Sequence, residues 1–527
     1  MNLSPAVLSR VGVTRIQMRR CAYPAAIGPT CGASGFPFGV SSHGTPQRLI
    51  THGHRGTSTN TTPPPSSNPA ANPNGSTPNQ TQTSGSAPSA ANQQRRFYHL
   101  QRMGSFTSAP KVPNEDAEDP DVSIPTQMTR DALLERCRWE HSRLPALIRR
   151  NFRCIAPSKE SEENGEDWTL SSGVRLVGWN LLSRVCSSTA SPNHLRVLQW
   201  NVLSQALGQE NDNFMCCPEE ALEWQTRRFQ MLEEILEYNP DIICLQEVDH
   251  FGFLYRALSS VGYVGTFFPK PDSPCLYVPG NNGPDGCAIF FRAEKFQLMS
   301  VDTRILEVWR VQSNQVAIIA RLSIRETGQQ ILVCTTHLKA RKGALLSTLR
   351  NEQGRDLLDF IARHAAATEA EIGKRPPVIV CGDFNAEPIE PVYSSVLSDK
   401  RLNLASAYAQ YPVTPTASNM VNGNAEDVPD DKEGRLTPLE SGLREPPYTT
   451  WKVRESEGEV CHTIDYIFHS HESLAVESFL EFPTGEDIGP GRVPSLSYPS
   501  DHFSLVCDFQ IHDPSGKGVV SKKEDEI

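Results

Sequence analysis

Short apolar runs rich in Val, Ile, Leu and Phe follow one another between residues 195 and 511, and turns or longer amphipathic stretches separate them. Runs of this length and composition are typical of β-strands with buried faces. The predicted strands are residues 196–203, 241–248, 286–291, 315–324, 330–338, 377–385, 463–470 and 502–509.

Two stretches between these strands repeat their apolar residues near helical spacing. The first lies between Pro218 and Pro240, and the second is Ser347 to Ala366. A shorter helical lead-in, packed on the domain surface, is predicted over Asp131 to Phe152 within a linker of residues 125–194. Strands with helices between some of them predict an α/β domain over residues 195–511, with sheets inside and helices outside.

The first 114 residues differ in charge from the rest of the chain. They contain ten Lys and Arg and no Asp or Glu, so this segment carries +10; because the whole chain carries −11, residues 115–527 carry −21. Within residues 1–40, arginines lie among apolar residues in an acid-free amphipathic pattern that is typical of a mitochondrial presequence. We therefore predict a mitochondrial protein, with a disordered basic tail and a cytoplasmic form as the alternatives.

Three further segments are too polar to predict a packed core. Residues 41–124 are dominated by Ser, Thr, Asn, Gln, Pro and Gly, which predicts a disordered spacer. Residues 414–445 are predicted to be an inserted acidic loop, either a solvated excursion or a regulatory or partner site. Residues 512–527 are predicted to be a charged tail.

Cysteine usage and hydropathy exclude several classes of protein. Buried reduced thiols are predicted rather than disulfides, because five of the 14 cysteines lie inside predicted core strands: Cys244, Cys287, Cys334, Cys381 and Cys507. No pair of C-x2-C motifs is present, which argues against a structural zinc site. No run of about 18 apolar residues occurs, so no transmembrane helix is predicted.

Most of the predicted strands end in polar side chains that can bind ligands or transfer protons. These clusters are Trp200-Asn201, Gln246-Glu247, His337, Asp383 with Asn385, Asp465, and Asp501-His502. One such cluster alone would usually be a turn. Six in one domain form a joint signal: if the strand ends converge, they form a carboxylate-rich cleft on a rigid sheet.

This ordered set of motifs, including G-D-F-N at 382–385 and S-D-H at 500–502, resembles the endonuclease/exonuclease/phosphatase superfamily. Longer phrases resemble one group of that superfamily more than its deadenylase or sphingomyelinase members: QWNVLSQALG, LEEILEYNPDIICLQEVDH, THLKAR, VCGDFNAEP and YPSDHFSLVCDF. The similarity covers about residues 195–511, with weaker similarity near 125–152. It implies a two-sheet sandwich flanked by helices and a metal-dependent phosphohydrolase.

The resemblance also implies roles for individual residues. Glu247 is expected to be the main ligand of Mg²⁺, with Mn²⁺ as the alternative ion, because hard cations prefer carboxylate oxygens. Asn201 would support the metal or the phosphate, and Asp501 is a lesser candidate for the metal. Asp383 would position or deprotonate the attacking water, and Asn385 would hold a phosphoryl oxygen.

Two imidazoles complete the expected machinery. His502 would contact the phosphate as a donor or acid and would be oriented by Asp465, while His337 would add a further donor. Many members of the superfamily have an acidic residue two positions after the first Asn of this set. Leu203 stands there in this chain, so a single metal ion is expected rather than two.

Basic residues near the motifs are expected to bind the charge of the substrate: Lys270, Lys339, Arg341 and Arg454. The resemblance implies that these residues bind the phosphates of NADP(H) and that the reaction removes the 2′-phosphate to give NAD(H). The alternative is a poly(A)-specific 3′ exoribonuclease, an mRNA deadenylase. Long RNA usually requires an extended basic groove or a stacking platform, so the charge of −21 favours NADP(H).

A third hypothesis is a non-catalytic adaptor that recruits partners through its long tails. It would be favoured by loss of Glu247 or His502, and both residues are present.

Overall fold

The computed structural model describes residues 123–155, 191–210, 212–411 and 436–512. The predicted presequence and nearly all of the spacer, residues 414–435 of the predicted acidic loop, and the tail from residue 513 lie outside the described residues. Within the described part of the chain, none of the helices combines the length and the hydropathy that a membrane span requires.

The first sheet has seven strands in the order β1-β14-β15-β2-β3-β5-β4. Their bounds are Phe152–Cys154 (β1), Leu474–Leu480 (β14), Leu505–Ile511 (β15), His194–Asn201 (β2), Ile242–Val248 (β3), Gly286–Arg292 (β5) and Tyr263–Pro269 (β4). Only β2 and β3 are parallel neighbours. Helix α5 (Trp224–Tyr238) lies in the connection between them.

The second sheet has six strands in the order β10-β13-β9-β8-β7-β6. Their bounds are Leu404–Ser406 (β10), Asp465–Ser470 (β13), Val378–Asp383 (β9), Gln330–His337 (β8), Val311–Ile324 (β7) and Phe296–Val308 (β6). Here β8 and β9 are the parallel pair, joined through the long helix α7 (Ala344–Ile372). Each sheet therefore contains one β-α-β unit, and the carboxyl ends of its two parallel strands lie at the same edge.

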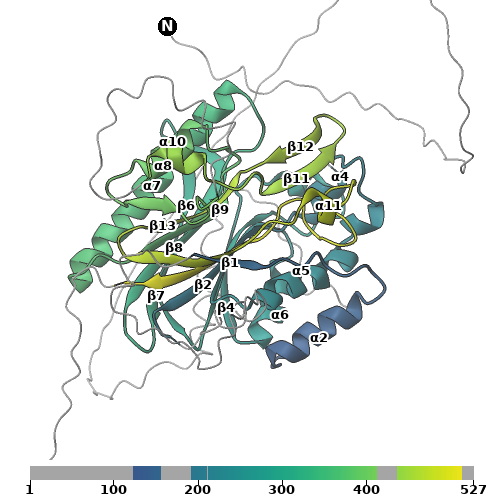
Figure 1. Ribbon diagram of the computed structural model, residues 1–527, viewed down its shortest axis with the longest axis horizontal. Helices are drawn as coiled ribbons and strands as arrows, with labels where there is room; N and C mark the ends of the chain where they lie inside the picture. The colour runs from purple at the N-terminus through teal and green to yellow at the C-terminus, as the bar shows by residue number, and fades with distance from the viewer. Residues whose placement is uncertain (1–122, 156–190, 211, 412–435, 513–527) are drawn as a thin grey trace, which may run out of the picture. The chain divides into compact units, whose positions relative to one another are not determined.

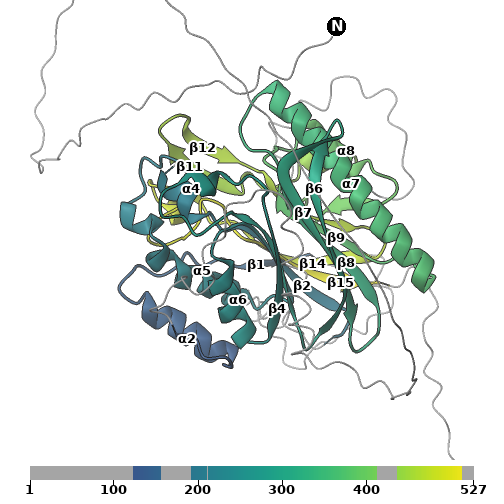
Figure 2. The same ribbon diagram turned by 180° about the vertical axis from the view of Figure 1, so that it is seen from behind.

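The two sheets pack face to face with helices on both outer sides (Figures 1 and 2). Apolar residues of both sheets form the inner layer, among them Ile242 and Cys244 from the first and Ile318 and Val333 from the second. Helices α2 (Arg130–Glu140), α5 and α6 (Phe251–Ser260) cover the first sheet, and α7 and α8 (Pro391–Leu397) cover the second. The expected two-sheet sandwich flanked by helices is confirmed.

Several smaller elements complete the described structure. They are α4 (Gln205–Glu210), η4 (Glu219–Leu222), η5 (Pro274–Tyr277), α10 (Pro438–Gly442), α11 (Gly485–Ile488) and a hairpin of β11 (Thr450–Arg454) and β12 (Gly458–His462). Figure 1 shows this hairpin at the upper end of the sheets, beside α4.

All eight predicted strands and both predicted internal helices are present, and α7 is longer than expected. The predicted lead-in helix over residues 131–152 is wrong beyond Glu140: α2 ends there, and Phe152 begins strand β1, which pairs with β14. Leu133 and Leu134 of α2 are buried, and α2 packs on α5.

Residues 436–445 also differ from the prediction of a solvated acidic loop. They contain the capped helix α10, and the carboxyl group of Glu445 is buried, where it accepts a hydrogen bond from the Tyr393 hydroxyl at 2.7 Å. The cysteines of the described ranges are free thiols, and the five predicted to be buried in core strands are buried.

Candidate active site

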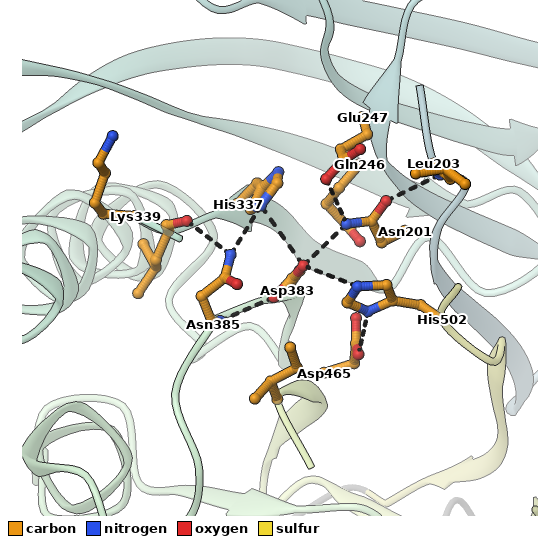
Figure 3. Close-up of polar contacts among 12 residues, drawn as sticks. Asn201, Leu203, Gln246, Glu247, His337, Lys339, Asp383, Asn385, Asp465 and His502 are labelled. Carbon is orange, nitrogen blue, oxygen red and sulfur yellow. Dashed lines mark hydrogen bonds and ion pairs between the residues drawn. The ribbon is translucent and has the colours of Figure 1, made fainter. Parts of the chain in front are cut away.

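The predicted strand-end residues meet at one edge of the sandwich. Asn201 pairs with Gln246 across the first parallel pair, and His337 pairs with Asp383 across the second. Asp465 begins the antiparallel neighbour β13 and also lies opposite Asp383. Because the carboxyl ends of both parallel pairs open to the same side, residues that are far apart in the sequence line one site (Figure 3).

The side-chain amide of Asn201 joins the two sheets. Its Nδ2 donates to Glu247 Oε1 at 3.0 Å and to Asp383 Oδ2 at 2.9 Å, while its Oδ1 accepts from the Leu203 amide at 3.0 Å (Figure 3). One amide group thus stands between two carboxylates that belong to different sheets.

Three non-glycine residues at this edge have left-handed backbone conformations. The φ angles are +59° at Leu203, +55° at Glu247 and +49° at Asn385. Such conformations cost on the order of 1–3 kcal/mol each and persist where the surrounding structure requires them. Glu247 lies in the bulge of β3, where the register against β5 shifts between Leu245 and Val248, and the bulge brings its carboxylate to the cleft.

Close approach of the two strands explains the glycine of the G-D-F-N motif. A Cβ atom at Gly382 would lie 2.5 Å from the Thr336 carbonyl oxygen of the neighbouring strand. Glycine therefore lets β9 run tightly beside β8, which sets Asp383 next to His337.

His502 is held by a carboxylate from the second sheet. Its Nδ1 lies 2.8 Å from Asp465 Oδ2, and that oxygen also accepts a hydrogen bond from the Thr449 hydroxyl at 2.7 Å. The other oxygen of Asp465 accepts from Gln199 Nε2 at 3.2 Å. Burial alone would lower the pKa of His502, but the nearby carboxylates, Asp465 first, raise it to about 9.

Asp383 lies at the centre of the site. Its Oδ2 lies 3.8 Å from His502 Nε2 and 3.5 Å from His337 Nε2, and its Oδ1 accepts from the Asn385 amide at 2.8 Å. Burial and the neighbouring charge of Asp465 raise the pKa of Asp383 to about 7. A carboxyl group with such a pKa can exchange a proton near neutral pH.

His337 and Asn385 form a second polar pair beside Asp383. Nδ2 of Asn385 lies 2.9 Å from His337 Nε2 and donates to the Leu338 carbonyl at 3.1 Å. Burial, with Lys270 close by, lowers the pKa of His337 well below its usual range, so its imidazole is neutral. The structure thus brings both residues to the site, with the Asn385 amide already bonded to protein groups.

The four basic residues expected to bind substrate fall into two kinds. Lys270 is buried in an ion pair with Asp285 at 2.6 Å, and Arg454 is paired with Asp212 at 2.9 Å and Asp501 at 3.3 Å. Lys339 and Arg341 are exposed, and neither forms an ion pair with a carboxylate in the described ranges.

Asp501 reaches the site but is already neutralised. Its carboxylate forms ion pairs with Lys452 and Arg454. Burial would raise its pKa, but Lys452, His502 and Arg454 outweigh burial and hold the pKa well below the usual range. Because its charge is already balanced by Lys452 and Arg454, the Asp501 carboxylate is poorly suited to bind a metal ion as well.

Sequence reasoning assigned no role to several residues that complete the site: Gln199, Gln246, Asp285, Thr449 and Lys452. Lys452 had a usable signal, because it alternates with Arg454 on a strand and so lies on the same face. Gln246 precedes Glu247 at the end of its strand, and its Nε2 donates to Gln199 Oε1 at 2.7 Å.

The chemistry of the donor groups limits where a metal ion could bind. Within the described residues, Asp383, Asp465 and His502 form one cluster with metal-ligand spacing, but His502 and Asp465 are paired with each other and the raised pKa of His502 favours the imidazolium, which cannot ligate. Glu247 is the least buried carboxylate of the site and lies beside Asn201. A half-buried carboxylate with access to water fits Mg²⁺, whereas the Asn201 side chain turns its Nδ2, a hydrogen-bond donor, toward Glu247 and its Oδ1 toward the Leu203 amide.

Comparisons with known proteins identify the family of the chain. Residues 198–502 match the model of the endonuclease/exonuclease/phosphatase family. Nocturnin of Drosophila melanogaster is 51% identical over 426 residues, which are 80% of this chain and 62% of that protein, so the chain spans less than two thirds of this relative. Nocturnin of Xenopus laevis is 47% identical over 328 residues, which are 62% of this chain and 75% of that protein.

A solved structure, that of the human nocturnin catalytic domain with bound sulfate anion, is 41% identical with a TM-score of 0.46 and covers 61% of this chain and 95% of that chain. By its family match and by these curated relatives, the chain belongs to the endonuclease/exonuclease/phosphatase family and, within it, to the nocturnins.

Proposed function

We propose that the protein is a Mg²⁺-dependent phosphohydrolase that removes the 2′-phosphate of NADP(H) to give NAD(H). The observation that carries the proposal is a chain of polar contacts at the sheet edge. Asn201 joins Glu247 to Asp383, and Asp383 lies within 3.8 Å of a histidine whose charge is supported by Asp465. The residues proposed as cation ligand, base and acid thus lie at one edge of the sandwich.

The residues divide the reaction between them. Glu247 would hold Mg²⁺, which supplies neutralisation of the phosphoryl charge when bound, and Asn201 would orient the carboxylates of Glu247 and Asp383. Water adds its oxygen to phosphorus while the bond between phosphorus and the ribose 2′ oxygen breaks. Asp383 accepts the proton of the water, and His502 donates a proton to the leaving oxygen.

The distribution of charge supports a small anionic substrate. Lys339 and Arg341 are exposed beside the site without acidic partners in the described ranges, so their charges are free to meet phosphate. The surrounding chain from residue 115 carries −21, which opposes the approach of a long polyanion. A dinucleotide needs only these few local cations, whereas poly(A) would need a longer basic path.

A phosphate-release screen tests this proposal directly. The purified full-length protein is incubated with NADPH, NADP⁺, oligo(A) or a sphingolipid phosphodiester in the presence of Mg²⁺ or Mn²⁺. We expect release of phosphate from NADPH or NADP⁺. Trimming of oligo(A) without any such release would favour the exoribonuclease, and inactivity on all four substrates would favour the adaptor.

We also propose that the protein is imported into mitochondria, on the basis of the Arg-rich, acid-free pattern of residues 1–40. A fluorescent reporter fused behind these residues should collect in mitochondria. A reporter that stays diffuse in the cell would contradict import.

A further inference from the structure

The loop of residues 338–343 connects β8 to α7. Buried side chains of α7 form hydrogen bonds to its backbone. Nη1 of Arg350 donates to the carbonyl oxygens of Lys339 and Arg341, at 3.0 Å and 2.7 Å. The backbone amide of Lys339 donates to Gln353 Oε1 at 3.0 Å. These contacts bind the backbone of the two residues whose side chains are exposed and unpaired with acids in the described ranges.

A carboxylate at the N-terminus of α8 fixes Arg350 itself. Glu390 accepts hydrogen bonds from Nη2 and Nε of Arg350 at 2.7 to 3.1 Å in a bidentate arrangement. Arg350 is among the largest fully buried side chains of the described structure. Burying a guanidinium group costs several kcal/mol unless it is paired and hydrogen-bonded, and Glu390 with the two loop carbonyls supplies these bonds to Arg350.

The far end of the loop is held as well. Nζ of Lys342 lies 2.7 Å from His462 Nε2 on β12, and His462 Nδ1 lies 2.8 Å from Glu387 Oε1. Between the two attachments, Arg341 has a φ of +81°, a left-handed conformation that a non-glycine residue adopts only under constraint. With its carbonyls turned toward Arg350, the loop leaves the side chains of Lys339 and Arg341 to the solvent side.

We propose that Arg350, fixed by Glu390, is a positioning residue that pre-arranges Lys339 and Arg341 to bind a phosphate of the substrate other than the one that is cleaved. The inference rests on the proposed function, because it assigns these cations to a substrate with more than one phosphate. A loop fixed before binding loses less conformational freedom when it meets the anion, so its charges contribute more to affinity.

The test compares Arg350→Lys with the wild-type full-length protein. Lysine keeps the positive charge but loses the planar fork that reaches two carbonyls and Glu390 at once. We expect the KM for NADPH to rise about 10-fold with kcat within about 2-fold, which is the pattern of lost uniform binding. Calorimetric binding of adenosine 2′,5′-bisphosphate, which needs no turnover, should weaken by a similar factor.

A double-mutant cycle separates positioning from general stability. In the background Lys339→Ala/Arg341→Ala, the change Arg350→Lys should cause no further loss of affinity, because the side chains that it positions are gone. Equal losses in both backgrounds would overturn the inference. Arg304→Lys is the matched control, since Arg304 ties α7 to β6 through Asp356 without contacting the loop, and its KM should equal that of the wild type.

A second variant keeps the test decisive if Arg350→Lys does not fold. Gln353→Met removes only the acceptor of the Lys339 amide and leaves the ion pair of Arg350 with Glu390 in place. It should raise the dissociation constant of the bisphosphate in the same direction, and an unchanged constant would overturn the inference. Weaker bisphosphate binding in a protein that releases no phosphate from NADPH would instead reject the proposed function alone.

Discussion

Nδ1 of His502 lies 2.8 Å from Asp465 Oδ2, and both side chains are buried. The carboxylate favours the charged imidazolium over the neutral ring, which outweighs the opposite effect of burial. The pair therefore keeps a proton on His502 at the pH of the cell, facing Asp383.

This pairing predicts the alkaline limb of the pH-rate profile. Since His502 acts in its protonated form and its pKa is about 9, activity should be present at neutral pH and fall as the pH rises through about 9. Asp465→Asn removes the charge that raises this pKa, so the limb should move to lower pH, with a loss of about 100-fold in kcat/KM at pH 8. A profile measured over pH 6 to about 10 that keeps its limb in the variant would contradict this role. Asp302→Asn, an exposed carboxylate on β6, is the control.

Removal of the Glu247 carboxylate should abolish hydrolysis without unfolding the protein. Its side chain is only half-buried, and its polar contacts are with Asn201 and the Ser204 amide, so the core packing is preserved. We expect Glu247→Ala to lower kcat by about 1,000-fold or more, as loss of a major electrostatic stabiliser does. Circular dichroism and thermal melting should match the wild type. Substantial activity in this variant would remove Glu247 from the machinery.

Metal binding can be measured separately for the two candidate carboxylate ligands, Glu247 and Asp501. Treatment with a chelator should abolish activity, and added Mg²⁺ should restore it. In calorimetry, Glu247→Ala should lose Mg²⁺ binding, whereas Asp501→Asn should retain it because Asp501 is already paired with Lys452 and Arg454. Loss of binding in Asp501→Asn with retention in Glu247→Ala would reverse the assignment of the ligand.

Glu445 predicts a pH dependence of stability that is independent of catalysis. Burial raises its pKa from 4.5 to about 7, so ionising it in the folded protein is unfavourable. The contribution of Glu445 to the free energy of unfolding should therefore be greatest below pH 4.5. This contribution should fall by about 3 kcal/mol as the pH rises to about 7.

The substitution Glu445→Gln should remove this loss, because an amide keeps an oxygen for the Tyr393 hydroxyl and carries no charge. Urea unfolding at pH 5 and pH 8 should therefore show a smaller difference for the variant than for the wild type. Identical pH dependence in the two proteins would contradict a buried, titrating Glu445. The exposed Glu457→Gln is the control.

Much of the fold was predictable because most strands are buried on both faces. The runs around Ile242 and Ile379 are continuous and apolar, and they form strands at the predicted places. Strand β6 was missed because it lies at the edge of its sheet and many of its side chains are exposed, so its sequence has no continuous apolar run. The hairpin β11–β12 was missed for a similar reason, since it lies outside both sheets.

The residues of the site were predictable where a polar side chain ends an apolar strand. They were not predictable where the role of a residue depends on its contacts with residues far away in the sequence. Asn201, Asp383 and His502 stand out because polar residues end apolar runs. Arg350 does not stand out, because an arginine in an amphipathic helix is ordinarily a solvated charge. Its role becomes visible only when Glu390 and two loop carbonyls are found around it. Similarly, the sequence cannot show that the charge of Asp501 is neutralised by Lys452.

The apolar layer between the two sheets acts as a spacer for the reacting groups. Glu247 stands on one sheet and Asp383 on the other, so the thickness of the hydrocarbon between them sets how far apart the two carboxylates lie. A missing methyl group at Ile318 could let one sheet settle toward the other, and catalysis depends more steeply on distance than folding does. The turnover rate should therefore respond more strongly than the melting temperature to small changes in the packing between the two sheets.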